Sequence, residues 1–151
     1  NEKNTFALEG KAVAQYELKY YSESLKTYEE IVFDIKERRT IHGYKKKQFE
    51  KILHLIMSEL MHEEKYDLAL SYSDISYNIE LFDKETLEFR GEILLHLERN
   101  VEALECYEKF LEKDISIGRI WNNKGVVLRK LGRDEEADKC FVKAKELEEN
   151  E

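Results

Sequence analysis

The sequence contains no proline, only six glycines and two cysteines, and no long run of apolar residues. Without proline there is no rigid proline-rich linker to divide the chain, so we expect one domain over residues 1–151. No stretch approaches the roughly 18 apolar residues that a membrane-spanning helix needs. The beginning of the chain also lacks the basic start and apolar block of a signal peptide. These absences predict a soluble, cytoplasmic protein that makes no membrane contact.

Charge and missing motifs narrow the classes of function. The chain carries 33 acidic and 25 basic side chains, and the net charge of -8 argues against general nucleic-acid binding. It has no glycine-rich phosphate loop, no nucleophile elbow and no zinc signature. We therefore expect no enzyme activity, no cofactor and no metal site.

An internal repeat of 34 residues organises the chain. A shift of 34 places superimposes small residues on small ones and aromatic residues on aromatic ones. Within each period the apolar residues recur at helical spacing and a polar break interrupts them, which predicts a helix, a turn and a second helix. The matching pairs are Gly91 with Gly125, Leu94 with Leu128, Ala103 with Ala137, Cys106 with Cys140, Tyr107 with Phe141, Leu60 with Leu94 and Ala69 with Ala103.

The pattern at these residues resembles the tetratricopeptide repeat family, whose 34-residue unit has large, small and aromatic residues at fixed places. The last unit is a near-ideal copy, with Trp121, Gly125, Ala137, Phe141 and Ala144 at those places. The resemblance implies an all-α, right-handed α-solenoid of about four helix-turn-helix repeats. Their approximate ranges are 5–38, 50–83, 84–117 and 118–151, and the second is degenerate because Met57 occupies the place of the small residue.

Residues 39–49 are an insertion between the first two repeats, read as two helices lengthened on either side of a turn at Gly43. The surrounding segment 36–51 carries net charge +5, against -13 for the rest of the chain. Such a patch could serve a nucleic acid or an acidic partner, although a solvated hairpin is the commoner explanation. Its basic residues are Lys36, Arg38, Arg39, Lys45, Lys46, Lys47 and Lys51.

The family resemblance also implies a binding surface, because the first helix of each unit lines the concave face of the superhelix. Side chains at positions 2, 5, 9, 12 and 13 of each unit point into that groove, where a protein or peptide would bind. An acidic stripe of Glu85, Glu88 and Glu92 lies there between two basic strips, and these strips could instead pair with one another. The candidate groove residues are Lys51, His54, Ser58, His62, Glu85, Glu88, Glu92, His96, Arg119, Asn122, Val126, Arg129 and Lys130.

The function predicted on this basis is a non-catalytic scaffold that binds a protein or peptide. An intracellular receptor for a signalling peptide is an alternative that some members of the family provide. A clamp for a C-terminal carboxylate is disfavoured, because only the last unit supplies side chains of the right type, in Asn122, Asn123, Arg119 and Arg129.

The sequence also predicts the redox state of the cysteines and the direction in which the pKa of the histidines is shifted. Cys106 and Cys140 occupy equivalent helices separated by a third helix, which is too far for a disulfide, so we expect reduced packing thiols. Nearby carboxylates should raise the pKa of groove histidines above the usual value of about 6.5.

The end of the last repeat gives one more expectation. The chain stops after the second helix of that repeat without an added capping helix, which leaves Val142 and Leu147 partly exposed. We therefore expect either a part of a longer protein or a homo-oligomer that packs through the C-terminal helix.

Overall fold

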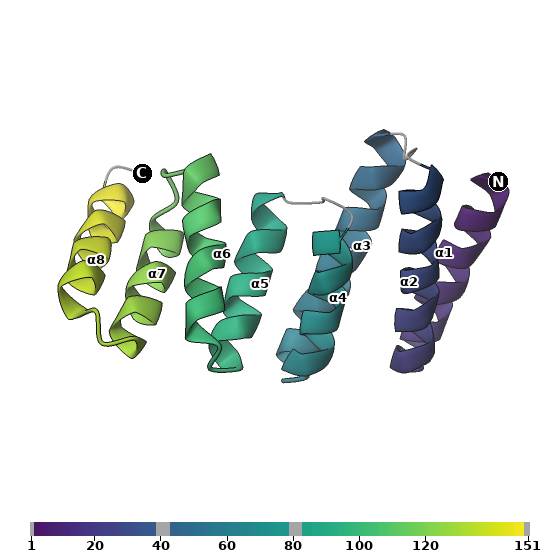
Figure 1. The fold of residues 1–151 in the computed structure, drawn as a ribbon, viewed down its shortest axis with the longest axis horizontal. Coiled ribbons are helices and arrows are strands. Elements are labelled where there is room, and N and C mark those ends of the chain that lie inside the picture. The colour runs from purple at the N-terminus through teal and green to yellow at the C-terminus, as the bar shows by residue number, and fades with distance from the viewer. Residues whose placement is uncertain (1, 39–42, 79–82, 150–151) are drawn as a thin grey trace.

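The computed structural model describes the backbone of residues 2–38, 43–78 and 83–149, and these residues form eight helices and no strand. The side chains described are those of residues 7–31, 33, 47, 50–77 and 83–149. The helices stand side by side in chain order from one end of the molecule to the other (Figure 1). They are α1 (Glu2–Glu17), α2 (Tyr21–Arg38), α3 (Gly43–His62), α4 (Tyr66–Asn78), α5 (Lys84–His96), α6 (Asn100–Lys113), α7 (Gly118–Lys130) and α8 (Asp134–Glu148).

The fold is the predicted all-α right-handed solenoid of four helix pairs. We call α1 and α2 unit 1, α3 and α4 unit 2, α5 and α6 unit 3, and α7 and α8 unit 4. Each first helix packs on its own second helix, and α4 and α6 pack in turn on the first helix of the next unit. In the part of the chain described, no helix is long and apolar enough to cross a membrane.

The turn inside every unit has the same backbone geometry. One residue per turn lies in the left-handed region, with φ of 63° at Lys19, 59° at Glu64, 58° at Glu98 and 74° at Gly132. In each turn the next residue donates its N–H to a carbonyl five residues back, as Arg99 does to Leu94 at 2.9 Å. This bond closes a Schellman motif, which ends the first helix and reverses the chain. Only one of the four positions is glycine, the residue that the geometry favours.

In unit 3 and again in unit 4, the two helices of the unit pack together through a glycine on one helix and an aromatic ring on the other. A Cβ atom built on Gly91 would lie 2.7 Å from the Tyr107 ring, and one built on Gly125 would lie 2.7 Å from the Phe141 ring. These distances are shorter than any van der Waals contact allows, so the absence of a side chain lets the helices approach closely. The two contacts are related by the 34-residue shift, as the sequence predicts.

Units 1 and 2 use other residues at the same repeat positions. In unit 2 the glycine is replaced by fully buried Met57, and the aromatic residue is replaced by fully buried Ser73. In unit 1, Ala12 and Tyr28 occupy these places, and the Ser24 hydroxyl donates to the Ala12 carbonyl at 2.8 Å. The large and the small residue have therefore exchanged places in unit 2.

The helices on either side of the insertion are the two longest in the described part of the chain, and α3 contains residues 43–49 of the insertion. Helix α2 has 18 residues and α3 has 20, whereas the remaining helices have 13 to 16. Helix α3 begins at Gly43, where the sequence predicts a turn, and residues 39–42 lie outside the described part of the chain. In Figure 1 the start of α3 rises above the neighbouring helices.

Both cysteines are buried and unpaired, with 6% of each residue exposed. Burial raises the pKa of the Cys106 thiol to about 11 and also raises the pKa of Cys140. The thiols are therefore protonated near neutral pH, as expected for packing residues with little nucleophilic character.

Candidate functional site

The predicted groove residues lie on α3, α5 and α7, at positions that helical spacing places on one side of each helix, and we call this side the first-helix face. Packing of α3 on α5 and of α5 on α7 makes this face continuous. His54 is buried, and Glu88, Glu92 and Val126 are half-buried. The exposed members are Lys51, Ser58, His62, Glu85, His96, Arg119, Asn122, Arg129 and Lys130.

His54 connects α3 to the start of α5. Its Nδ1 lies 3.1 Å from Glu85 Oε2, and its Nε2 lies 2.9 Å from Thr86 Oγ1 and 3.5 Å from Asp83 Oδ1. Burial opposes the charged form of His54, but the hydrogen bonds and charges of Asp83 and Glu85 outweigh it, so the pKa of His54 is raised. The predicted direction of the histidine shift is thereby confirmed at His54.

Glu88 makes the corresponding connection between α5 and α7. Arg119 donates to both carboxylate oxygens of Glu88, from Nε at 2.5 Å and from Nη2 at 2.7 Å. The two connections are equivalent under the 34-residue shift, since His54 corresponds to Glu88 and Glu85 corresponds to Arg119. The signs of the charges are reversed between them. Two of the three stripe carboxylates thus pair with neighbouring units.

His54, Asp83 and Glu85 also form the one group of potential metal ligands among the residues described, with ligand atoms within 4.8 Å of one another. Each carboxylate faces a different nitrogen of the imidazole ring, which suits an imidazolium donor better than a single metal ion. Asp83 additionally caps α5 by accepting from the Thr86 N–H at 2.8 Å.

Glu92 is the member of the stripe for which no ion pair is found among the described residues. It lies on α5 one turn after Glu88 and is half-buried. Burial, and then the charge of Glu88, raise the pKa of Glu92, while His96 and Arg119 lower it by a smaller amount. The face therefore retains one carboxylate whose charge is not neutralised by a direct partner.

Half-buried apolar side chains also occur on the first-helix face. Met61 and Leu95 are equivalent under the 34-residue shift and lie on the packed helices α3 and α5. Val126 on α7 is equivalent to Glu92 and is also half-buried. The face thus carries half-buried apolar side chains as well as charged and polar ones.

Two other predicted residues turn towards second helices. Arg129 pairs with Asp138 on α8, and its guanidinium lies 5.0 Å from the centre of the Phe141 ring. The His96 ring stacks on Tyr66 of α4, with centroids 4.4 Å apart and planes at 7°. These side chains border the first-helix face and contribute to packing between helices.

The basic patch is described only in part. Lys47 and Lys51 are exposed and lie one turn apart on α3. The side chains of Lys36, Arg38, Arg39, Lys45 and Lys46 lie outside the described residues.

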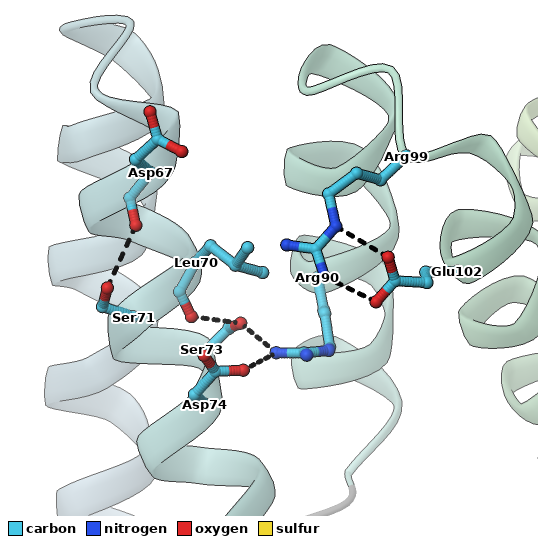
Figure 2. A network of polar contacts seen from close by, with 8 residues as sticks. All are labelled: Asp67, Leu70, Ser71, Ser73, Asp74, Arg90, Arg99 and Glu102. Atoms are coloured by element: carbon cyan, nitrogen blue, oxygen red, sulfur yellow. Dashed lines mark hydrogen bonds and ion pairs between the residues drawn. The ribbon is translucent and has the colours of Figure 1, made fainter.

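A second set of polar contacts joins the units away from the first-helix face. Arg90 on α5 donates to Ser73 Oγ at 2.6 Å and to Asp74 Oδ1 at 2.5 Å on α4, as Figure 2 shows. Lys124 lies 3.1 Å from Glu108 at the equivalent positions of the next two units. These pairs were not predicted from the sequence. Opposite charges 16 residues apart, occurring twice at a separation of 34, are the signal that would have revealed them.

Comparison with known proteins supports the same architecture. The model of the tetratricopeptide repeat family matches residues 118–151, and no curated protein matches the chain. Solved structures of MamA, a tetratricopeptide-repeat protein, are similar in fold at low sequence identity. A MamA mutant aligns with a TM-score of 0.66 and 19% identity, covering 95% of this chain and 96% of that chain.

Two further MamA structures give the same result. One crystal structure has a TM-score of 0.64 and 15% identity, covering 99% of this chain and 81% of that one. MamA from Desulfovibrio magneticus RS-1 has a TM-score of 0.61 and 17% identity, covering 97% of this chain and 77% of that one. At such identities the likeness extends to the fold alone.

Proposed function

We propose that this chain, whose residues 118–151 are a tetratricopeptide repeat and whose fold is a tetratricopeptide-repeat solenoid, is a non-catalytic scaffold that binds a protein segment. The binding surface is the first-helix face. The observation that carries the proposal is that half-buried apolar residues Met61, Leu95 and Val126 occur on the same three helices as Glu92 and its neighbours, and Glu92 has no ion-pair partner among the described residues. An apolar strip with a few charged groups is the chemistry by which helical grooves hold peptides.

Photo-crosslinking tests this proposal directly. A benzophenone amino acid is placed at Leu95 or Val126 on the first-helix face, or at exposed Val101 on α6 as a matched control. After irradiation in cells that produce the protein naturally, we expect the same crosslinked partner from the first two positions and none from the third. Adducts from Val101 alone would assign binding to the second helices and contradict the proposal.

A basic interface on α3 is the second candidate function. The observation that favours it is the exposure of Lys47 and Lys51 on the same side of that helix. An acidic partner or a nucleic acid would bind there with a strong dependence on salt concentration. Titration of labelled RNA and DNA at 50 and 200 mM salt, with Lys47→Glu/Lys51→Glu as the control, distinguishes this function from peptide binding.

Self-association through α8 is a further part of the proposal. Val142 is 59% exposed on the outer side of α8, and Leu147 near the end of that helix is half-buried. Association through these residues would bury apolar surface. Sedimentation of the wild type and of Val142→Glu over a range of concentrations checks this, since only the wild type should form larger species.

A cytoplasmic location is supported by the two buried free thiols, which suit a reducing compartment.

A further inference from the structure

The carboxylates of the first-helix face differ in what they contact. Glu85 lies 3.1 Å from His54, and Glu88 accepts two hydrogen bonds from Arg119. These two side chains pair with neighbouring units, and the Glu85 side chain is 73% exposed beside its one imidazole contact. Glu92 has no such partner among the described residues, so it is the stripe carboxylate whose charge no neighbouring unit balances directly.

The surroundings of Glu92 make an unpaired charge costly. Burial of part of the side chain disfavours its charged form, and the charge of Glu88 one turn earlier on α5 disfavours it further. The Arg119 guanidinium does not cancel this, because it donates to both carboxylate oxygens of Glu88. A cation brought by a ligand would therefore gain more at Glu92 than at a fully solvated carboxylate.

Apolar residues border the same position. Leu95 lies one turn after Glu92 on α5, and Met61 and Val126 occupy the inner positions of the flanking helices α3 and α7. A ligand cation paired with Glu92 would lie on the same helix face as Leu95. A lysine or arginine suits this position, because its methylene chain packs on apolar surface while its charged end stays polar.

Building on the proposed function, we infer that the bound segment carries a lysine or arginine that pairs with Glu92 and has apolar residues beside it that pack on Met61, Leu95 and Val126. The ligand is thus a basic and apolar peptide, matched to an acidic protein by charge at one defined position. Glu85, Glu88 and Arg119 connect neighbouring units through their pairs with His54 and with each other.

Peptide selection on the purified chain tests this inference. A phage library of random 12-residue peptides is selected on the wild type, on Glu92→Gln and on Glu105→Gln, which removes an exposed carboxylate from α6. We expect lysine or arginine next to leucine, isoleucine or valine in the wild-type and Glu105→Gln selections. The Glu92→Gln selection should keep the apolar residues and lose the enrichment in basic ones.

Affinity and pH dependence provide the second measurement. A synthetic peptide from the wild-type selection should bind Glu92→Gln roughly tenfold or more weakly, and Glu105→Gln as well as the wild type. Because the pKa of Glu92 is raised, wild-type affinity should fall with decreasing pH above the ordinary carboxyl range, and Glu92→Gln should show no such fall. Circular dichroism confirms that the variants are folded.

The outcomes separate the inference from the proposed function. Equal basic enrichment on Glu92→Gln, or none on the wild type, would overturn the pairing with Glu92. Val126→Arg tests the surface itself, since it places a cation among the apolar residues of the first-helix face. If the selected peptides bind Val126→Arg as tightly as the wild type, they bind elsewhere, and both the proposed function and the inference are overturned.

Discussion

Units 3 and 4 are built almost identically, whereas units 1 and 2 reach the same helix-turn-helix geometry with different residues. In units 3 and 4 a glycine faces an aromatic ring at 2.7 Å. In unit 2, Met57 and Ser73 take those places, and in unit 1, Ala12 and Tyr28 do. The comparison indicates that the repeat constrains the combined volume of the two positions and leaves open which helix supplies the larger side chain.

The junctions between units differ as well. Units 1 and 2 meet through tyrosines, with Tyr72 packed edge-on against Tyr16 at 6.3 Å and Tyr28 at 5.9 Å. Units 3 and 4 meet through charges, notably the bidentate pair of Glu88 and Arg119. The aromatic junction should therefore depend little on salt and pH, and the charged junction more.

The largest expected effect comes from restoring the usual glycine in unit 2. Met57→Gly removes a fully buried side chain opposite a serine and adds the helix cost of glycine, so the free energy of unfolding should fall by about 3–5 kcal/mol. Met57→Gly/Ser73→Phe should recover part of the loss, because the ring would fill the space as in unit 4. Urea denaturation measures both, and a loss under about 1 kcal/mol for Met57→Gly would refute the volume exchange.

The converse change adds volume inside units 3 and 4, at the position where the two helices of each unit are closest. Gly91→Ala and Gly125→Ala each place a methyl group against an aromatic ring. The free energy of unfolding should fall by about 1–2 kcal/mol, because the cost of overpacking exceeds the gain in helix propensity. Gly10→Ala is the matched control. Gly10 lies in α1 with nothing within 4 Å of the added Cβ atom, so this variant should gain about 0.5–1 kcal/mol. Thermal unfolding of the three variants gives the ranking, and equal effects would contradict it.

A smaller effect distinguishes the two equivalent connections on the first-helix face. The folded-state pKa of His54 lies above its unfolded value of about 6.5, so its stabilisation is complete below that pH and is lost as pH rises through the folded pKa. Relative to His54→Gln, the wild type should lose stability as the pH rises above about 6.5, by less than about 1.4 kcal/mol per pH unit. The contribution of Arg119, measured with Arg119→Gln, should stay constant there because the guanidinium remains charged. If the free energy of unfolding changed with pH in the same way for the wild type and for His54→Gln, a stabilising charged form of His54 would be excluded.

The smallest expected effect concerns the turns. Glu98→Gly should stabilise unit 3 by roughly 0.5–1 kcal/mol, because glycine adopts the positive φ of 58° without strain. Gly132→Ala, at the equivalent place in unit 4, should destabilise by about 1 kcal/mol. Equilibrium unfolding of both variants checks the signs, and a destabilised Glu98→Gly would indicate that the glutamate side chain contributes more than the strain costs.

The fold was predictable because the repeat signal lies in residues that determine packing. Gly91, Gly125, Tyr107 and Phe141 identify the helix pairs by size alone, and the structure brings them together as expected. The left-handed turn residues Lys19 and Glu64 were not predictable from residue type, because side chains of this kind rarely adopt positive φ.

The candidate site was predictable as a set of positions and less so as a set of interactions. Helical spacing places Glu85, Glu88 and Glu92 on one face, but it does not give distances to the next unit. The pairs of His54 with Glu85 and of Glu88 with Arg119 share a separation of 31 residues, which was a usable signal. Among the described residues, Glu92 lacks an ion-pair partner because the neighbouring guanidinium of Arg119 already pairs with Glu88. Only the three-dimensional arrangement shows which side chains are paired.

Methyl NMR of the peptide complex tests the central claim most directly. Spectra of the methionine, leucine and valine methyl groups are recorded as a peptide from the wild-type selection is added. The resonances of Met61, Leu95 and Val126 on the first-helix face should shift and saturate together. Val101 and Val142, exposed on the second helices α6 and α8, should not move. Shifts confined to Val101 and Val142 would contradict the account and place binding on the opposite side of the solenoid.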